Sequence, residues 1–306
     1  VIQNALYWLE EFRLDGLRLD AVHAIADDSR PDVIEELAAR VAAGPGRERH
    51  VHVVLENDRN EARYLRASEG RAVRCAAQWN DDFHHACHVL ATGETVGYYV
   101  AYADDPLRHL ARCLTQGFAY QGEVFPYSGE HRGRSTGGVP LTAFLNFLQN
   151  HDQVGNRAFG DRLGAVADRR RLALVTAIHL LAPSPPLLWM GEEWLAGTPF
   201  QYFCDFNPEL AELVRKGRRE EFARFPEFAD PALRERIPDP AAPATFARSK
   251  LDWAERGRAP HDAWLATCTE LLRLRREHVV PRLASGVVSA EAHRVSANEL
   301  RMDWRY

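Results

Sequence analysis

The stretches DGLRLDAV (residues 15–22) and VHVVLE (residues 51–56) decide the fold class of this 306-residue chain. Both are short runs rich in Leu and Val, which is typical of strands. Between them, PDVIEELAARVAA (residues 31–43) has the apolar spacing of a helix, starts with proline and ends before Gly44. A strand, a helix and a second strand in this order predict two parallel neighbours in one sheet.

The same alternation continues in both directions along the chain. It predicts an α/β fold, a parallel sheet wrapped by helices that is either a barrel or a doubly wound sheet. Residues 93–140, rich in Gly, Tyr and Pro, are predicted to form a functional loop region with a helix inside it. The expected helices are 3–13, one beginning near Asn60, 81–91, 105–116 and 169–182, and the further strands are 73–79, 143–149 and 186–190.

The pattern changes after Phe203, and this change suggests a domain boundary further on. Residues 205–260 are charged and Pro-rich and predict only short helical pieces, whereas residues 261–277 predict an amphipathic helix. From about residue 280 the sequence becomes β-like. We expect residues 1–278 to form one catalytic domain that includes the 205–260 excursion, and residues 279–306 to begin a C-terminal β-sandwich. Because the chain opens in mid-helix with VIQNALYWLEEF, we also expect a segment upstream of it.

Composition excludes several classes of partner. Asp and Glu (43) outnumber Lys and Arg (38), so no basic face for nucleic acid is expected. No run approaches 18 apolar residues, which argues against a membrane span. The five cysteines are scattered singly, which indicates a reducing, cytoplasmic location rather than a disulfide framework. The sequence leaves the oligomeric state open.

Three carboxylates each follow a predicted strand. Alternation puts Arg18 and Asp20 on one face of their strand, and Glu56 and Asp152 stand at the ends of two others. In a β/α barrel the catalytic loops gather at this end. Taken singly, each has a structural alternative: a buried ion pair for Arg18 and Asp20, a helix cap for Glu56, and turn chemistry for the Asn-His-Asp around Asp152.

Together the three carboxylates fit glycoside hydrolysis, which needs one carboxylate as nucleophile and a second as acid and base. Arg18 would lower the pKa of Asp20, and a less compensated site would keep Glu56 protonated. We expect their carboxyl groups to lie about 5–5.5 Å apart, the spacing of a retaining mechanism. Asp152 and His151 could bind sugar hydroxyls. Aromatic residues nearby offer stacking faces: Trp79, Phe83, Tyr98, Tyr99, Phe125, Tyr127 and Trp194.

Three motifs carry a resemblance to a known family. DGLRLDAVHAI, VVLEND and FLQNHDQ resemble, in the right order, signature regions of the α-amylase superfamily, glycoside hydrolase family 13. The resemblance implies an incomplete (β/α)8 TIM barrel, strands about four to eight, with Arg18 beside the nucleophile Asp20, Glu56 as acid, and His151 and Asp152 stabilising the transition state. The superfamily's earlier Asn-His, which ends its third strand, is absent from this chain.

Longer stretches narrow the resemblance. VLENDRNEARYL, QWNDDFHHACHVLATGE, QNHDQVGNRAFGDRL and MGEEWLAGTPFQYFCDFNPEL are similar to members that cut the α-1,4 bond next to a terminal trehalose. The implied partner is an α-glucan with a trehalose end. A glycogen-branching or other α-glucan transferase is the alternative. The substrate-binding residues predicted on this basis are Arg18, His23, Trp79, Asn80, Asp81, Asp82, His84, His151 and Gln153.

The HHACH segment invites a metal interpretation, because His84 and His88 lie one helical turn apart. Zinc would need further ligands at defined spacing, and none is evident in the sequence. We therefore predict no metal and no cofactor, with Ca²⁺ dependence left open. Glu192 and Glu193, which follow the last predicted strand, are interpreted as hydrogen-bonding groups at the barrel end.

Overall fold

Five parallel strands form the central sheet of the computed structural model, which describes residues 1–66, 75–223, 225 and 228–306. Each strand pairs with the next one along the chain, in the order β1-β2-β3-β4-β5. A doubly wound sheet would reverse its strand order at a switch point, so this uninterrupted order is that of part of a β/α barrel. The strands are β1 (Gly16–Leu19), β2 (His52–Leu55), β3 (Ala77–Trp79), β4 (Phe144–Phe147) and β5 (Pro186–Leu187).

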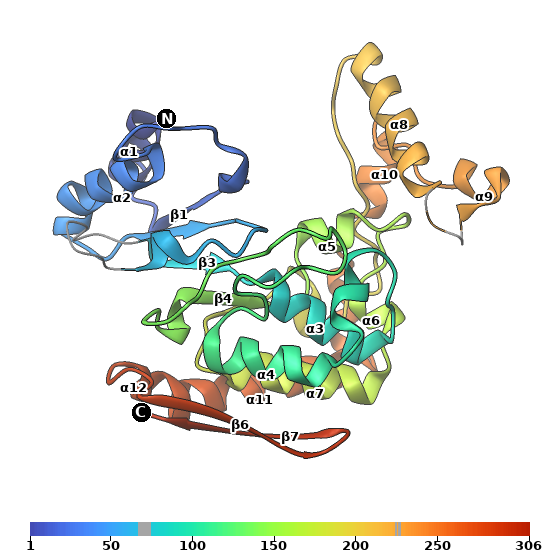
Figure 1. Cartoon of the computed structure of the whole chain (residues 1–306). Helices are drawn as coiled ribbons and strands as arrows, with labels where there is room; N and C mark the ends of the chain where they lie inside the picture. Colours follow the sequence, from blue (N-terminus) through green and yellow to red (C-terminus); the bar gives the residue numbers. More distant parts are fainter. Residues whose placement is uncertain (67–74, 224, 226–227) are drawn as a thin grey trace.

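Helices connect these strands and continue beyond the sheet (Figure 1). The α-helices are α1 (Ile2–Glu10), α2 (Val33–Ala43), α3 (Asp81–Thr92), α4 (Pro106–Gln116), α5 (His151–Gly155), α6 (Leu163–Val166), α7 (Arg169–Leu181), α8 (Pro208–Phe222), α9 (Pro231–Glu235), α10 (Pro243–Arg248), α11 (His261–Leu274) and α12 (Val280–Leu283). Short 3-10 turns are η1 (Val22–Ala24), η2 (Pro45–Arg47), η3 (Ala62–Leu65), η4 (Gly97–Tyr102), η5 (Leu141–Ala143), η6 (Glu192–Trp194) and η8 (Trp253–Gly257), and η9 (Arg275–Val279) is a π-helical turn.

Capping residues explain where the principal helices begin and end. The Asp32 side chain accepts hydrogen bonds from the backbone N–H groups of Ile34 and Glu35, at 3.1 and 3.0 Å, and starts α2. The Asn80 side chain starts α3 in the same way, and Gly93 ends it in the left-handed region with φ of 77°. Side-chain caps of this kind satisfy backbone donors that no helical carbonyl can reach.

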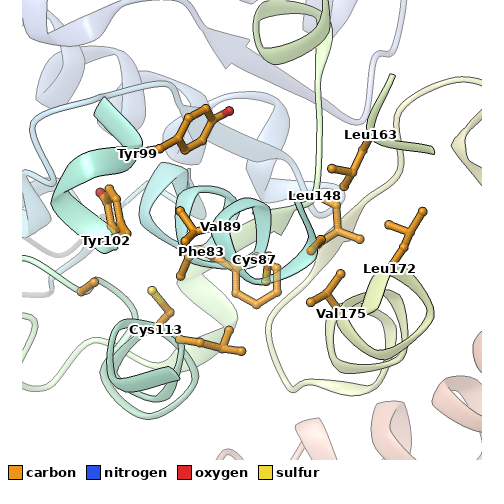
Figure 2. Packing of buried hydrophobic residues seen from close by; sticks show 14 of the residues in the cluster. Phe83, Cys87, Val89, Tyr99, Tyr102, Cys113, Leu148, Leu163, Leu172 and Val175 are labelled. Atoms are coloured by element: carbon orange, nitrogen blue, oxygen red, sulfur yellow. The ribbon is translucent and has the colours of Figure 1, made fainter. Parts of the chain in front are cut away.

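Two hydrophobic clusters hold the helices against the sheet. One joins α1 and α2 to β1 and β2 through buried residues such as Leu9, Leu37 and Leu55. The larger one surrounds α3, where Phe83 and Cys87 are fully buried among side chains from α4 and α7 (Figure 2). The helices thus pack against the sheet through these two clusters.

The part after β5 adds two substructures. Helices α8, α9 and α10 lie on the side of α5 (Figure 1), and a small cluster around Phe222 and Phe228 includes Ala158, from the segment after α5. Strands β6 (Ser289–Ser296) and β7 (Glu299–Arg305) form an antiparallel hairpin. The hairpin packs on α4, where the Trp304 indole N–H donates to the Leu114 carbonyl at 3.1 Å.

Arg275, which follows α11, connects the chain after the excursion to the sheet. Its buried guanidinium donates to the backbone carbonyls of Leu180, Ala182, Pro183 and Ser184. These carbonyls lie at the end of α7 and in the turn that leads into β5. The start of β5 is therefore held by a side chain that is about 90 residues further along the chain.

The structure confirms the predicted α/β part-barrel and corrects some boundaries. Within the described residues 60–66, no α-helix forms where one was expected to begin near Asn60. That residue has a positive φ of 53° and its side-chain amide is buried against Asp82, so only the short turn η3 forms there. The excursion contains α8, a longer helix than predicted, and α12 precedes the hairpin where β structure was expected. The first residues of the predicted 73–79 strand lie outside the described residues. The domain boundary near residue 278 stays a prediction.

Within the described ranges, none of the helices combines the length and apolar character needed to cross a bilayer.

Candidate active site

Asp20 and Glu56 lie side by side because of the strand register. Leu19 of β1 is the register partner of Leu55 of β2, so the residues that follow them leave the sheet at the same edge. The Glu56 carboxylate also accepts the Ala21 backbone N–H at 2.8 Å, and Ala21 has a left-handed φ of 40°. A left-handed conformation strains a non-glycine residue, and such strained residues are enriched at functional sites.

Arg18 joins the two carboxyl groups. Its Nη1 lies 2.5 Å from Asp20 Oδ1, and its Nη2 lies 2.8 Å from Glu56 Oε2. The guanidinium also lies 4.2 Å from the ring centroid of Trp79, at the end of β3. A planar guanidinium suits this arrangement, because it binds two carboxylates along one edge and stacks through its face.

The two carboxyl groups have pKa values displaced in opposite directions. A hydrogen bond with Glu56 and the charge of Arg18 lower the pKa of Asp20. Burial raises the pKa of Glu56, and the contact with Asp20 and the charge of Asp152 act in the same direction. Asp20 is thus favoured as the ionised group and Glu56 as the proton carrier, which is the division that acid and nucleophile require.

Arg18 contacts both carboxyl groups and so holds them near each other. The separation of about 5–5.5 Å expected for a retaining pair stays a prediction.

Asp152 lies on α5, directly after β4. The side chain of Asn150 caps this helix by accepting the backbone N–H groups of Asp152 and Gln153, at 2.9 and 3.0 Å. Nε2 of His151 is 3.5 Å from Asp152 Oδ1. The charge of His151 contributes to the lowered pKa of Asp20, and that of Asp152 contributes to the raised pKa of Glu56. The structure therefore brings all three predicted carboxylates into one electrostatic cluster.

Four further predicted residues lie around this cluster. Trp79 lies between Arg18 and His151, with its ring centroid 6.0 Å from that of His151. His23 faces Asp58, with Nδ1 3.4 Å from Oδ1. Gln153 donates to Asp81 Oδ1 at 3.4 Å and accepts from the Tyr98 hydroxyl at 3.2 Å. Asp81 is half-buried, and burial raises the pKa of its carboxyl to about 7.

Asn80, Asp82 and His84, in contrast, are buried, and their hydrogen bonds go to protein groups. The Asn80 side chain donates to the Gly117 carbonyl and to Asn146 Oδ1, at 2.7 and 2.9 Å. The ring nitrogens of His84 contact the Leu148 carbonyl and the Tyr99 hydroxyl, at 2.6 and 3.0 Å. Burial lowers the pKa of His84 to about 3, so the ring is neutral. These contacts point to a structural role rather than to substrate contact.

Asp82 is the most heavily bonded carboxylate of this group. It accepts from the Tyr102 hydroxyl at 2.5 Å, from the Asn60 amide at 2.8 Å, and from the backbone N–H groups of Ala119 and Tyr120. Arg132 adds an ion pair at 3.2 Å. Asp82 thus fastens the 93–140 loop to the start of α3.

Sequence reasoning missed three residues near the site. Arg132 and Asp58 come from loops whose partners are distant in the chain, and no local pattern marks them. Trp189 has a ring centroid 5.9 Å from that of His151, and its place just after β5 was a usable signal. Glu192, interpreted as a barrel-end group, does accept the Trp189 backbone N–H, at 3.1 Å.

A metal centre is not evident in the described part of the chain, where no group of three or more His, Cys, Asp or Glu side chains could hold an ion. His88, the last histidine of HHACH, instead contacts Glu94 Oε2 at 2.7 Å. Arg157 binds the same carboxylate through two contacts, at 2.9 and 3.0 Å.

Comparisons with known proteins define the class. No family model matches the chain. An alpha-amylase-assigned protein of Salmonella typhimurium has a crystal structure that superposes with a TM-score of 0.91 at 44% identity, over 100% of this chain and 51% of that one. A pullulanase from Bacillus acidopullulyticus shares the fold alone, with a TM-score of 0.52 at 12% identity, over 98% of this chain and 31% of that one. The parallel sheet of the chain is a partial TIM barrel that matches alpha-amylase structures.

Curated relatives then show which enzymes the chain is similar to in sequence. Malto-oligosyltrehalose trehalohydrolase of Arthrobacter ramosus is 44% identical over 300 residues, 97% of this chain and 51% of the relative. The enzyme of the same name from Saccharolobus solfataricus is 35% identical over 91% of this chain and 46% of the relative. The chain is a homologue of the malto-oligosyltrehalose trehalohydrolases, and it spans about half the length of the curated relatives it matches.

Proposed function

We propose that the protein containing this chain is a retaining glycosidase that cuts the α-1,4 bond next to the terminal trehalose of a malto-oligosyl trehalose. The observation that carries the proposal is the cluster in which Arg18 bridges Asp20 and Glu56 at the ends of β1 and β2. The names of the relatives support the trehalose-ended substrate.

In the proposed first step, an Asp20 carboxylate oxygen bonds to the anomeric carbon on the glucan side of the scissile bond. The bond from that carbon to the leaving oxygen breaks, and Glu56 gives its proton to this oxygen, which releases trehalose. In the second step Glu56 removes a proton from water, and the water oxygen displaces Asp20 from the anomeric carbon. The malto-oligosaccharide then leaves with its anomeric configuration retained, and both carboxyl groups are restored.

Arg18 and Asp152 have supporting roles in this proposal. Arg18 keeps Asp20 ionised and so ready to attack. Asp152 has its charge near Glu56 and could bind sugar hydroxyls as positive charge develops on the ring. His23, Trp79, Asp81, His151 and Gln153 are the proposed substrate contacts around them.

The five cysteines support a cytoplasmic location as part of the same proposal. All are free thiols, four of them buried and Cys204 half-buried. Free thiols persist in a reducing compartment.

Product analysis of the full-length protein on maltotriosyl trehalose tests the function. We expect equal amounts of trehalose and maltotriose, with the new reducing end in the α configuration by NMR. Longer or branched glucans without free trehalose would indicate a transferase of the same family instead. A β product would contradict the retaining mechanism.

A further inference from the structure

A continuous series of aromatic rings leads away from the catalytic cluster. It starts at His151, whose ring centroid is 5.9 Å from that of Trp189. Trp189 is 5.0 Å from Phe200, and Phe200 is 5.9 Å from Phe203. Phe246, from α10 of the excursion, closes the series at 5.1 Å from Phe203. The helix that carries Asp152 is thus connected by ring contacts to the excursion.

The outer end of this series opens into a cavity of about 400 Å³, which we call the aromatic hollow. Cavities that bind small ligands have volumes from about 300 Å³ upward, with mostly apolar walls and a few polar groups. The hollow has this composition. Its lining residues are Met190, Phe200, Phe203, Phe246, Ser249, Lys250, Leu251 and Trp253.

Backbone contacts fix the wall of the hollow before any ligand binds. The Phe200 N–H donates to the Gly160 carbonyl at 2.9 Å, and the Gln201 N–H donates to the Ser249 hydroxyl at 3.0 Å. Gly160 has a φ of +70°, and a Cβ there would lie 2.4 Å from the Phe200 carbonyl oxygen. The two segments therefore meet at a distance that only glycine permits, and a wall held this firmly loses little entropy on binding.

The exposed rings at the hollow indicate the ligand class. Phe246 and Trp253 are 47% and 59% exposed. The Lys250 ammonium lies 4.8 Å from the Phe246 ring centroid, and the Arg256 guanidinium lies 5.0 Å from that of Trp253. A sugar ring presents an apolar C–H face and a rim of hydroxyl groups, which suits aromatic faces beside hydrogen-bond donors. The ring series links this hollow to His151, beside Asp152, through side-chain packing.

We propose that the aromatic hollow binds glucose units of the α-glucan chain remote from the bond that is cut. This inference rests on the proposed function, because it extends the same substrate beyond the cluster of Asp20, Glu56 and Asp152. Longer glucans would gain binding energy there that short ones cannot reach.

Chain-length dependence in the full-length protein tests the proposal, with the Phe203→Ala and Phe246→Ala variants. Phe206→Ala is the matched control, since Phe206 is 45% exposed and does not line the hollow. We expect kcat/KM for long malto-oligosyl trehaloses to fall about tenfold in the two variants, the size expected when one stacking contact is lost. Values for the shortest cleaved substrate, and all values for the control, should stay as in the wild type.

Direct binding separates a failure of this proposal from a failure of the proposed function. If the wild type releases no trehalose, calorimetric titration with maltoheptaose still tests the hollow, with weaker binding expected in Phe246→Ala. An active wild type whose variants keep its chain-length dependence would overturn the proposal. Lower melting temperatures with unchanged maltoheptaose affinity would also overturn it, because they would show that the hollow packs against protein.

Discussion

Two groups of acidic residues follow strands of one sheet, yet their surroundings differ. Asp20, after β1, has a side chain that is 78% exposed, and its contacts are with Arg18 and Glu56. Asp82, just after β3, has no exposed surface and is bonded to two backbone N–H groups, an amide, a hydroxyl and Arg132. The carboxylate oxygens of Asp20 remain accessible to a ligand, whereas those of Asp82 already accept hydrogen bonds from the protein.

The comparison shows that the position of a carboxylate after a barrel strand does not by itself assign a role. What separates the two groups is the number of protein donors already bound to each carboxylate. A saturated carboxylate such as Asp82 contributes to stability, and an unsaturated one such as Asp20 can react with a ligand. Substitutions in the two groups should therefore affect different measurements.

The largest effect is expected from Asp20→Asn and Glu56→Gln in the full-length protein. Each should lower kcat at least about 1,000-fold, because each group acts mainly in the transition state. The melting temperature should hardly change, since Asp20 is exposed and both substitutions keep the shape of the side chain. Steady-state kinetics measure the fall in kcat, and thermal melting measures any change in the melting temperature. A variant that keeps a tenth of the wild-type turnover would remove that residue from its role.

Asp82→Ala should show the opposite behaviour, with loss of stability first. It leaves Arg132 without its buried partner, a change that costs about 3–5 kcal/mol of unfolding free energy. Urea denaturation measures this loss, and the exposed Asp28→Asn is the control. Any fall in activity should follow the unfolded fraction. Normal stability combined with inactive protein would contradict the assignment of Asp82 to structure.

Asp81, which lies between the two groups, should make the stability of the protein depend on pH. Burial raises its folded pKa from 3.8 to about 7, and the charges of Asp82, Asp58 and Glu56 act in the same direction. The folded protein therefore holds a proton that the unfolded chain has lost, so this group makes stability fall as pH rises from about 4 to 7. Asp81→Asn should flatten that decline in urea titrations at several pH values. An unchanged slope, equal to that of the exposed Asp205→Asn, would contradict the raised pKa.

The smallest effect is expected from Glu94→Gln. Glu94 binds Arg157, just after α5, and His88 on α3, so it steadies the end of α5, the helix that carries Asp152. Loosening this helix should lower kcat a few-fold, since catalysis is sensitive to small displacements.

The pH dependence of stability gives a second measure of Glu94. The contacts with His88 and Arg157 lower its folded pKa from the usual 4.5. The stability it contributes is therefore present above pH 4.5 and is lost as pH falls below that value. Glu94→Gln should remove this acid-dependent part. Unchanged kinetics together with an unchanged acid profile would exclude the steadying role.

The strand register explains why much of the site was predictable. Alternation along DGLRLD and the position of Glu56 already placed three charged side chains at one edge, and pairing of Leu19 with Leu55 follows from parallel strands. Local periodicity likewise located α3 and α7 to within a few residues.

The roles within WNDDFHH were not predictable, because they depend on contacts distant in the chain. Asn80 is fixed by Gly117 and Asn146, and Asp82 is fixed by Asn60 and the 119–120 backbone. Nothing local distinguishes Asp81, which is half-buried at the site, from its buried neighbour. The helix expected after Asn60 failed for the same reason, since a tertiary hydrogen bond there outweighs helical propensity.

The hydrogen bonds from Arg275 to the turn before β5 have an evolutionary consequence. Arg275 holds the end of α11 against the turn before β5. The segment between β5 and α11 can therefore change in length or sequence without disturbing the sheet. The entropy cost of a longer loop grows only slowly with its length. Relatives are thus free to change α8–α10, and with them the outer wall of the aromatic hollow, while leaving the chemistry at Asp20 intact. Substrate preference and reaction can then diverge independently under selection.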